Sequence, residues 1–101
     1  MIESSNTNAR KIIAREYFNG KRSHYIPANQ WQREIHIFEK IAAEDIYELL
    51  RKNPRSPPLN LIESYRDRME AYSNKEHSIR TSTIFSIMYD TSNDIIDMLI
   101  C

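Results

Sequence analysis

Apolar residues in the second quarter of the chain recur at steps of three and four positions. They are Trp31, Ile35, Phe38, Ala42, Ile46 and Leu49. Because this spacing places side chains on one face of an α-helix, it predicts one long helix over residues 28–52. The polar pair Glu44-Asp45, directly after Ala43, interrupts the pattern. Two shorter helices with a bend at this point are therefore the alternative.

The last twenty residues carry a second and broader apolar pattern. On a helical wheel, three carboxylates line one side, and the opposite arc holds Ile84, Ile87, Met88, Ile95, Met98 and Leu99. The carboxylates are Asp90, Asp94 and Asp97. The pattern predicts a helix that begins near Thr81 or Ser82 and runs almost to the end of the chain. The apolar arc is wider than one layer of a four-helix bundle needs, so a second chain is expected to cover its edge. The predicted interface consists of Phe85, Tyr89, Ile96 and Ile100.

Two further patterns predict a first and a third helix. The first helix follows a polar, frayed segment over residues 1–6, begins at Thr7 or Asn8, and ends near Phe18. The third begins at Leu59 or Asn60 and ends near Tyr72. Its inward residues are expected to be Leu61, Ile62, Tyr65, Met69 and Tyr72.

The connections between these helices and the scarcity of glycine point to one fold class. Residues 21–27 show no period and end in proline, which favours a loop, although a short strand at 24–26 is the alternative. Residues 53–58 contain three prolines, which remove backbone donors, and they form a linker. Only one glycine occurs in 101 residues, whereas β-sheet proteins need many tight turns. The fold is expected to be all-α. It is a single four-helix up-down bundle-like domain over residues 1–101, with a long second helix and a proline-rich linker before the third.

Charge is balanced overall but uneven along the chain. Fourteen basic and fourteen acidic side chains give a formal net charge of zero, which provides no general attraction to nucleic acid or to an anionic membrane. The first 35 residues nevertheless carry six basic groups against three acidic ones. Cations beside an aromatic residue such as Tyr25 can hold phosphates and stack a base. A basic surface is therefore predicted, made of Arg10, Lys11, Arg15, Lys21 and Arg22.

Residues that could bind a metal or act as a nucleophile are few and scattered. His24, His36 and His77 are far apart, and none has a second ligand at the spacing of a helical metal site. The only cysteine is Cys101, which excludes an intrachain disulfide and favours a reducing compartment. No serine lies in a strand-turn-helix nucleophile motif. We therefore predict no metal, no cofactor and no nucleophilic catalysis.

Three acids on the predicted second helix resemble the first metal-binding element of all-α Mg²⁺-dependent nucleotide hydrolases. They are Glu44, Asp45 and Glu48. A second acidic element would have to come from Glu63 with Asp67, or from Asp94 with Asp97. Neither pair has the spacing or the position that such enzymes use. The acids are therefore expected to be solvated groups on amphipathic helices, and no catalytic residue is predicted.

The sequence identifies no function directly. We expect a small non-enzymatic helical module for protein interaction or regulation, of a size common among bacterial and phage proteins. The expected assembly is a homodimer, together with an unidentified protein partner. A nucleic-acid-associated regulator that uses the basic surface is the alternative, and a Mg²⁺-dependent nucleotide hydrolase is the least favoured. No apolar run has the length of a membrane span, so a cytoplasmic protein without membrane contact is expected.

Overall fold

The computed structural model describes residues 2–18, 30–76 and 78–100, and in these residues it consists of helices. Helix α1 (Ile2–Ile13) continues into a π-helical turn, η1 (Ala14–Phe18). Helices α2 (Gln30–Lys52), α3 (Pro58–Lys75) and α4 (Ile79–Ile100) follow. No strand occurs in the described segments, and the possible strand at 24–26 lies outside them. The predicted all-α class is confirmed.

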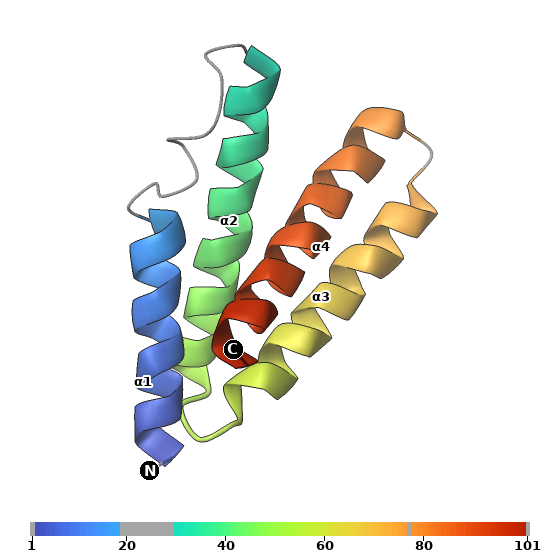
Figure 1. The fold of residues 1–101 in the computed structure, drawn as a ribbon. Helices are drawn as coiled ribbons and strands as arrows, with labels where there is room; N and C mark the ends of the chain where they lie inside the picture. The colour runs from blue at the N-terminus through green and yellow to red at the C-terminus, as the bar shows by residue number, and fades with distance from the viewer. Residues whose placement is uncertain (1, 19–29, 77, 101) are drawn as a thin grey trace.

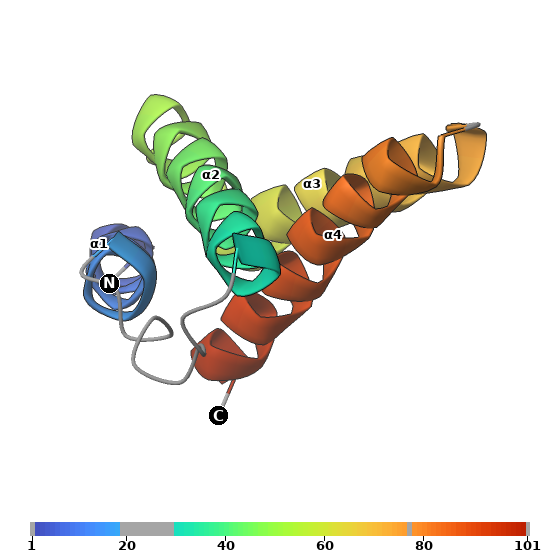
Figure 2. The same cartoon turned by 90° about the horizontal axis from the view of Figure 1, so that it is seen from above.

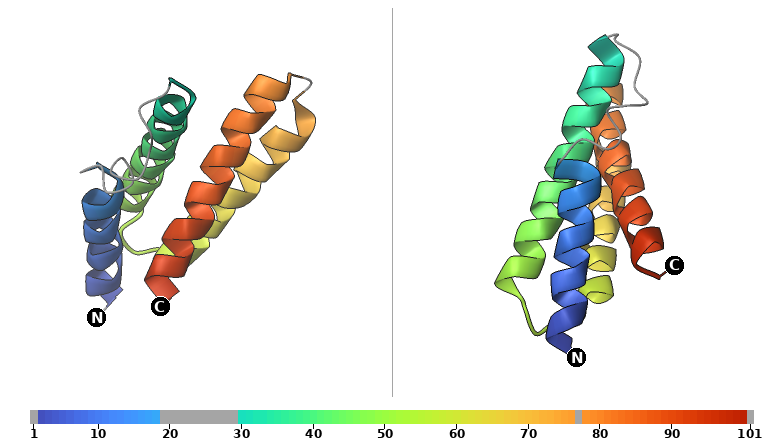
Figure 3. Two further views of the ribbon diagram at one scale, coloured as in Figure 1. Left: turned by 45° about the horizontal axis from the view of Figure 1, so that its top comes forward. Right: turned by 60° about the vertical axis from the view of Figure 1, so that its left-hand side comes forward.

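The helices alternate in direction along the chain, as expected for an up-down bundle (Figure 1). Helices α3 and α4 form a closely packed antiparallel hairpin, and α2 packs on α4. Helix α1 and η1 lie beside α2, and α1 also contacts α3 and α4 (Figures 2 and 3). The molecule is elongated, with principal extents of 42, 32 and 22 Å. Helix α2 is therefore the element that joins α1 to the α3–α4 hairpin.

The core lies where α2 meets its neighbours on both sides. Its fully buried members are Ile13, Ile46, Leu50, Ile62 and Ile95. Ala42 and Ala43 are adjacent in sequence and both fully buried, because α2 has one side toward α1 and another toward α4. Helix α2 is thus continuous through residues 43–45, and the two-helix alternative does not hold.

Helix α1 begins at Ile2, so the expected start at Thr7 or Asn8 is wrong. Asn6, which was expected in a frayed polar segment, is buried. Its Nδ2 donates a 3.3 Å hydrogen bond to the carbonyl of Leu50, near the end of α2. This contact spans 44 positions of sequence and holds the first turns of α1 against α2.

The α2–α3 connection follows the proline pattern closely. Asn53 Nδ2 donates a 2.8 Å hydrogen bond to the Leu49 carbonyl, which satisfies one acceptor at the end of α2. Helix α3 begins at Pro58, one residue earlier than predicted. Proline suits the first helical turn because its missing N–H is not needed there. The linker therefore ends at Pro57 rather than at residue 58.

Serine hydroxyls join α3 and α4 near the tip of the hairpin. Ser73 Oγ donates to the Ser82 carbonyl at 3.0 Å, and Ser82 Oγ donates to the Ser73 carbonyl at 3.0 Å. Ser73 Oγ also lies 2.8 Å from Ser86 Oγ. Small side chains let the two backbones approach closely, and their hydroxyls fix the alignment of the helices. These hydrogen bonds hold α3 and α4 in one alignment, and α2 packs against the resulting hairpin.

Candidate interaction surface

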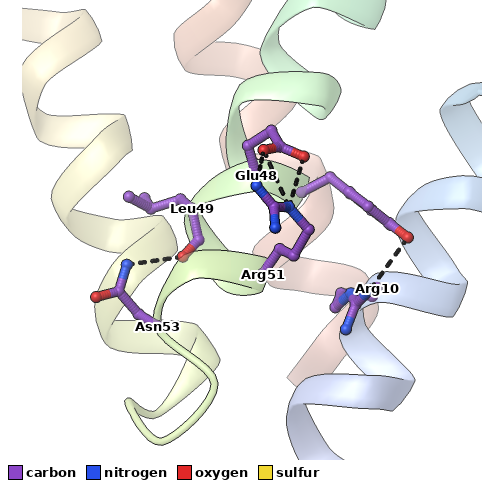
Figure 4. Close-up of polar contacts among 6 residues, drawn as sticks. Arg10, Glu48, Leu49, Arg51 and Asn53 are labelled. Carbon is purple, nitrogen blue, oxygen red and sulfur yellow. Dashed lines mark hydrogen bonds and ion pairs between the residues drawn. The ribbon is translucent and has the colours of Figure 1, made fainter.

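The predicted basic surface is only partly described, and its best-placed member faces inward. Arg10 on α1 donates a hydrogen bond of 3.4 Å from a terminal nitrogen to the Tyr47 hydroxyl on α2. Its guanidinium carbon also lies 5.1 Å from the centre of the Tyr47 ring, which is a cation–π geometry. Figure 4 shows Arg10 reaching from α1 toward α2. Arg10 therefore joins two helices instead of standing free for a phosphate.

The other basic residues give no defined cluster. Lys11 is exposed, and the exposed Arg15 lies 3.4 Å from Glu16 Oε1 on η1. Lys21 and Arg22 lie outside the described residues. Of the described members of the predicted basic surface, Arg10 and Arg15 therefore each contact a neighbouring side chain. Nucleic-acid binding through this surface stays a prediction.

The acids of α2 have different partners and do not converge. Arg51 binds Glu48 with three hydrogen bonds of 2.8 to 3.1 Å (Figure 4). These hydrogen bonds lower the pKa of Glu48 below its usual value. Asp45 instead accepts a 2.8 Å hydrogen bond from the Tyr65 hydroxyl on α3. Glu44 is exposed on the same helix.

No group of three or more potential metal ligands occurs among the residues that the structure describes. His36 Nδ1 lies 3.8 Å from Glu39 Oε1, one turn along α2, so the expectation that no histidine has a second ligand at helical spacing is wrong for His36. No third acid or histidine of the described residues joins this pair. The acids considered for a magnesium site therefore lie on solvated helix faces or bind neighbouring side chains.

The predicted interface on α4 does not form one exposed face. Ile96 is only 7% exposed and packs in the core. Phe85 and Tyr89 are half-buried, and the Phe85 ring lies 5.2 Å from the ring of Tyr72 on α3. Ile100 is exposed to 62%, at the end of the helix. The broad apolar arc is wide because α4 has α3 on one side and α2 on the other, so much of it is filled within the chain.

Exposed large apolar side chains also occur on α2 and α3, besides Ile100 and the 85% exposed Ile79 on α4. Ile37 and Ile41 are 52% and 37% exposed and lie one turn apart on the same face of α2. Tyr72, expected to be inward, is 45% exposed near the end of α3. Ile37 and Ile41 are apolar residues outside the predicted buried stripe of α2. That departure from the stripe is the sequence signal that identifies them.

These residues lie on segments of α2 and α3 that diverge in space. The Tyr65–Asp45 hydrogen bond connects α3 to α2. Beyond it, toward the beginning of α2 and the end of α3, the two helices diverge (Figures 1 and 2). Ile37 and Ile41 belong to the first half of α2, and Tyr72 belongs to the last turns of α3. We call the face of α2 that carries Ile37 and Ile41 the open-end surface.

In comparisons with known protein families, curated proteins and solved structures, no match to this chain was found. Among its described helices, none combines the length and the hydrophobicity needed to cross a lipid bilayer.

Proposed function

We propose that this protein is a non-enzymatic helical interaction module that self-associates through the open-end surface. The observation that supports the proposal is the exposure of Ile37 and Ile41 on one face of α2. Apolar residues four positions apart on an exposed helix face are the usual anchors when a helix packs against another protein. Association would remove both side chains from water, which is favourable in proportion to the apolar area buried.

A second copy of the chain is the partner that fits this surface. The chain has a formal net charge of zero, so two copies experience no overall electrostatic repulsion. A surface on one helix can also pair with the same surface of another copy around a two-fold axis, which gives a closed dimer. Such a dimer would present two identical sets of helices to a further protein. Binding of that protein to the dimer would be the route to its regulation.

The proposal is tested with paired variants of α2. Ile37→Gln combined with Ile41→Gln removes the apolar anchors, adds no charge and keeps good helix formers in place. Glu44→Gln, one turn further along the exposed face, is the matched control. Sedimentation equilibrium should give a weaker association for the double variant and an unchanged association for the control. Equal association of the native chain and the double variant, with native helix content, would contradict the proposal.

A further inference from the structure

A cavity of about 370 Å³ lies at the opposite end of the molecule from the open-end surface. There the lower turns of α1, the start of α3 and the end of α4 come together (Figure 1). Its walls include Ala9 and Ile12 of α1, residues 57–59, and Met98 and Leu99 of α4. Three elements that are distant in sequence therefore line one hollow.

The chemistry of the lining restricts what the cavity can hold. Among the residues that the structure describes, the eight that line the cavity carry no charge, and Asn8 supplies their one side-chain amide. A charged molecule would lose hydration on entering and would find no opposite charge, so ions and phosphorylated compounds are disfavoured. An amide can both donate and accept a hydrogen bond. The lining presents both polar and apolar area, so it suits a neutral molecule that combines an apolar body with hydrogen-bonding groups.

The size of the cavity sets the size of the ligand. An apolar cavity of about 150 Å³ is large enough to hold benzene. The present cavity is more than twice that volume and falls at the lower end of the range of about 300 to 1,000 Å³ for small-molecule pockets. It would accommodate a compact compound of two or three rings, or an aliphatic chain of similar volume.

The packing of α1 explains why the space is present. Helix α1 makes only limited contact with α2, α3 and α4, and the closer packing on α2 is that of η1. The rigid prolines at the start of α3 have no long side chains that could reach across the gap. A molecule in the cavity would contact all three elements at once, which the unfolded chain cannot offer.

We propose that this cavity is a binding site for a neutral small molecule that combines an apolar body with hydrogen-bonding groups. The site is separate from the open-end surface and does not depend on self-association.

The probe for the test is N-phenyl-1-naphthylamine, a neutral aromatic amine whose fluorescence increases in apolar surroundings. Its matched control is 8-anilino-1-naphthalenesulfonate, which has the same aromatic skeleton with an added negative charge. The uncharged probe should bind in a saturable manner and at least about tenfold more tightly than the sulfonate. Tighter binding of the sulfonate would overturn the proposed ligand class.

Methionine methyl groups locate the probe within the molecule. Met98 lines the cavity, whereas Met69 and Met88 are buried in the core and do not line it. In ¹³C-methyl spectra, the Met98 signal should shift on addition of the probe while those of Met69 and Met88 stay nearly unchanged. An unmoved Met98 signal would overturn the proposal. A Met98 shift that follows protein concentration instead of probe concentration would also overturn it, because a second copy would then cover the site.

Two tryptophan variants of α3 provide the final comparison. Leu59→Trp adds volume inside the cavity, and Asn60→Trp places the same side chain at an exposed neighbouring position that does not line it. Binding should fall at least about tenfold in the first and change less than about twofold in the second. Undiminished binding by folded Leu59→Trp would contradict the site. If that variant fails to fold, the Met98 shift in the native chain decides the question.

Discussion

The Tyr65 hydroxyl donates a 2.8 Å hydrogen bond to Asp45 Oδ2, and this bond joins α3 to α2. Tyr65 is buried and Asp45 is exposed, so the bond closes the edge of the core at the side where α2 and α3 separate. The guanidinium of Arg68, one turn along α3, lies 5.7 Å from the Tyr65 ring. This contact is one of those that position α2 relative to the hairpin.

Replacing Tyr65 with phenylalanine should lower the free energy of unfolding by about 1–2 kcal/mol, because a hydrogen bond to a charged acceptor is lost while the ring remains. Chemical denaturation followed by circular dichroism measures the change. Tyr72→Phe, in the same helix but with an exposed side chain, is the control and should have little effect. A loss no larger than that of the control would show that the bond contributes little to folding.

The same bond predicts a loss of stability at alkaline pH. Burial, and next the hydrogen bond to Asp45, raise the pKa of the Tyr65 hydroxyl far above its ordinary value near 10. The folded chain holds this proton more tightly than the unfolded chain. The contribution of Tyr65 to the free energy of unfolding is therefore complete below about pH 10 and declines as the pH rises further. The difference in unfolding free energy between native protein and Tyr65→Phe should therefore shrink above pH 10. A difference that is constant from pH 8 to pH 11 would contradict this assignment.

Replacing Asn6 with alanine should lower the free energy of unfolding by about 1–2 kcal/mol, because the buried Leu50 carbonyl loses its side-chain donor. Thr7→Ala changes an exposed neighbour and is the matched control. Hydrogen exchange should become faster in α1 while the α3–α4 hairpin stays protected. Unaltered exchange throughout α1 would mean that this contact does not hold the helix in place.

The Glu48–Arg51 pair should contribute little to the stability of the fold, although its nitrogen–oxygen distances are short. Its hydrogen bonds lower the pKa of Glu48, so any stabilisation is present above the usual carboxyl pKa and is lost as the pH falls. Both groups are exposed to solvent, which screens their attraction. Glu48→Gln should leave the thermal unfolding midpoint at pH 7 within experimental error. A clear decrease of that midpoint at pH 7 would identify the pair as a structural element.

Apolar periodicity predicted the fold class and the long continuous α2, since one helix face must be buried to form a core. The start of α1 could not be predicted in this way, because Asn6 finds its partner at Leu50, far away in sequence. A helical wheel gives the direction of the apolar face of a helix, but it does not give the number of helices that cover this face. For this reason Ile96 was expected at an interface and lies in the core.

The same limit applies to the surface residues. Tyr72 follows the apolar period of α3, yet it is exposed because α2 has diverged at that level. Ile37 and Ile41 are exposed and lie off the buried stripe, a departure from which their exposure could have been predicted. The cavity depends on how three helix ends meet, which no local pattern encodes.

Light scattering on the reduced protein over a concentration series tests the proposed self-association most directly. The mass should rise with concentration toward twice the 12.0 kDa of one chain, and Ile37→Gln with Ile41→Gln should move this rise to higher concentration. A native chain that keeps the mass of one chain at every concentration would contradict self-association through the open-end surface.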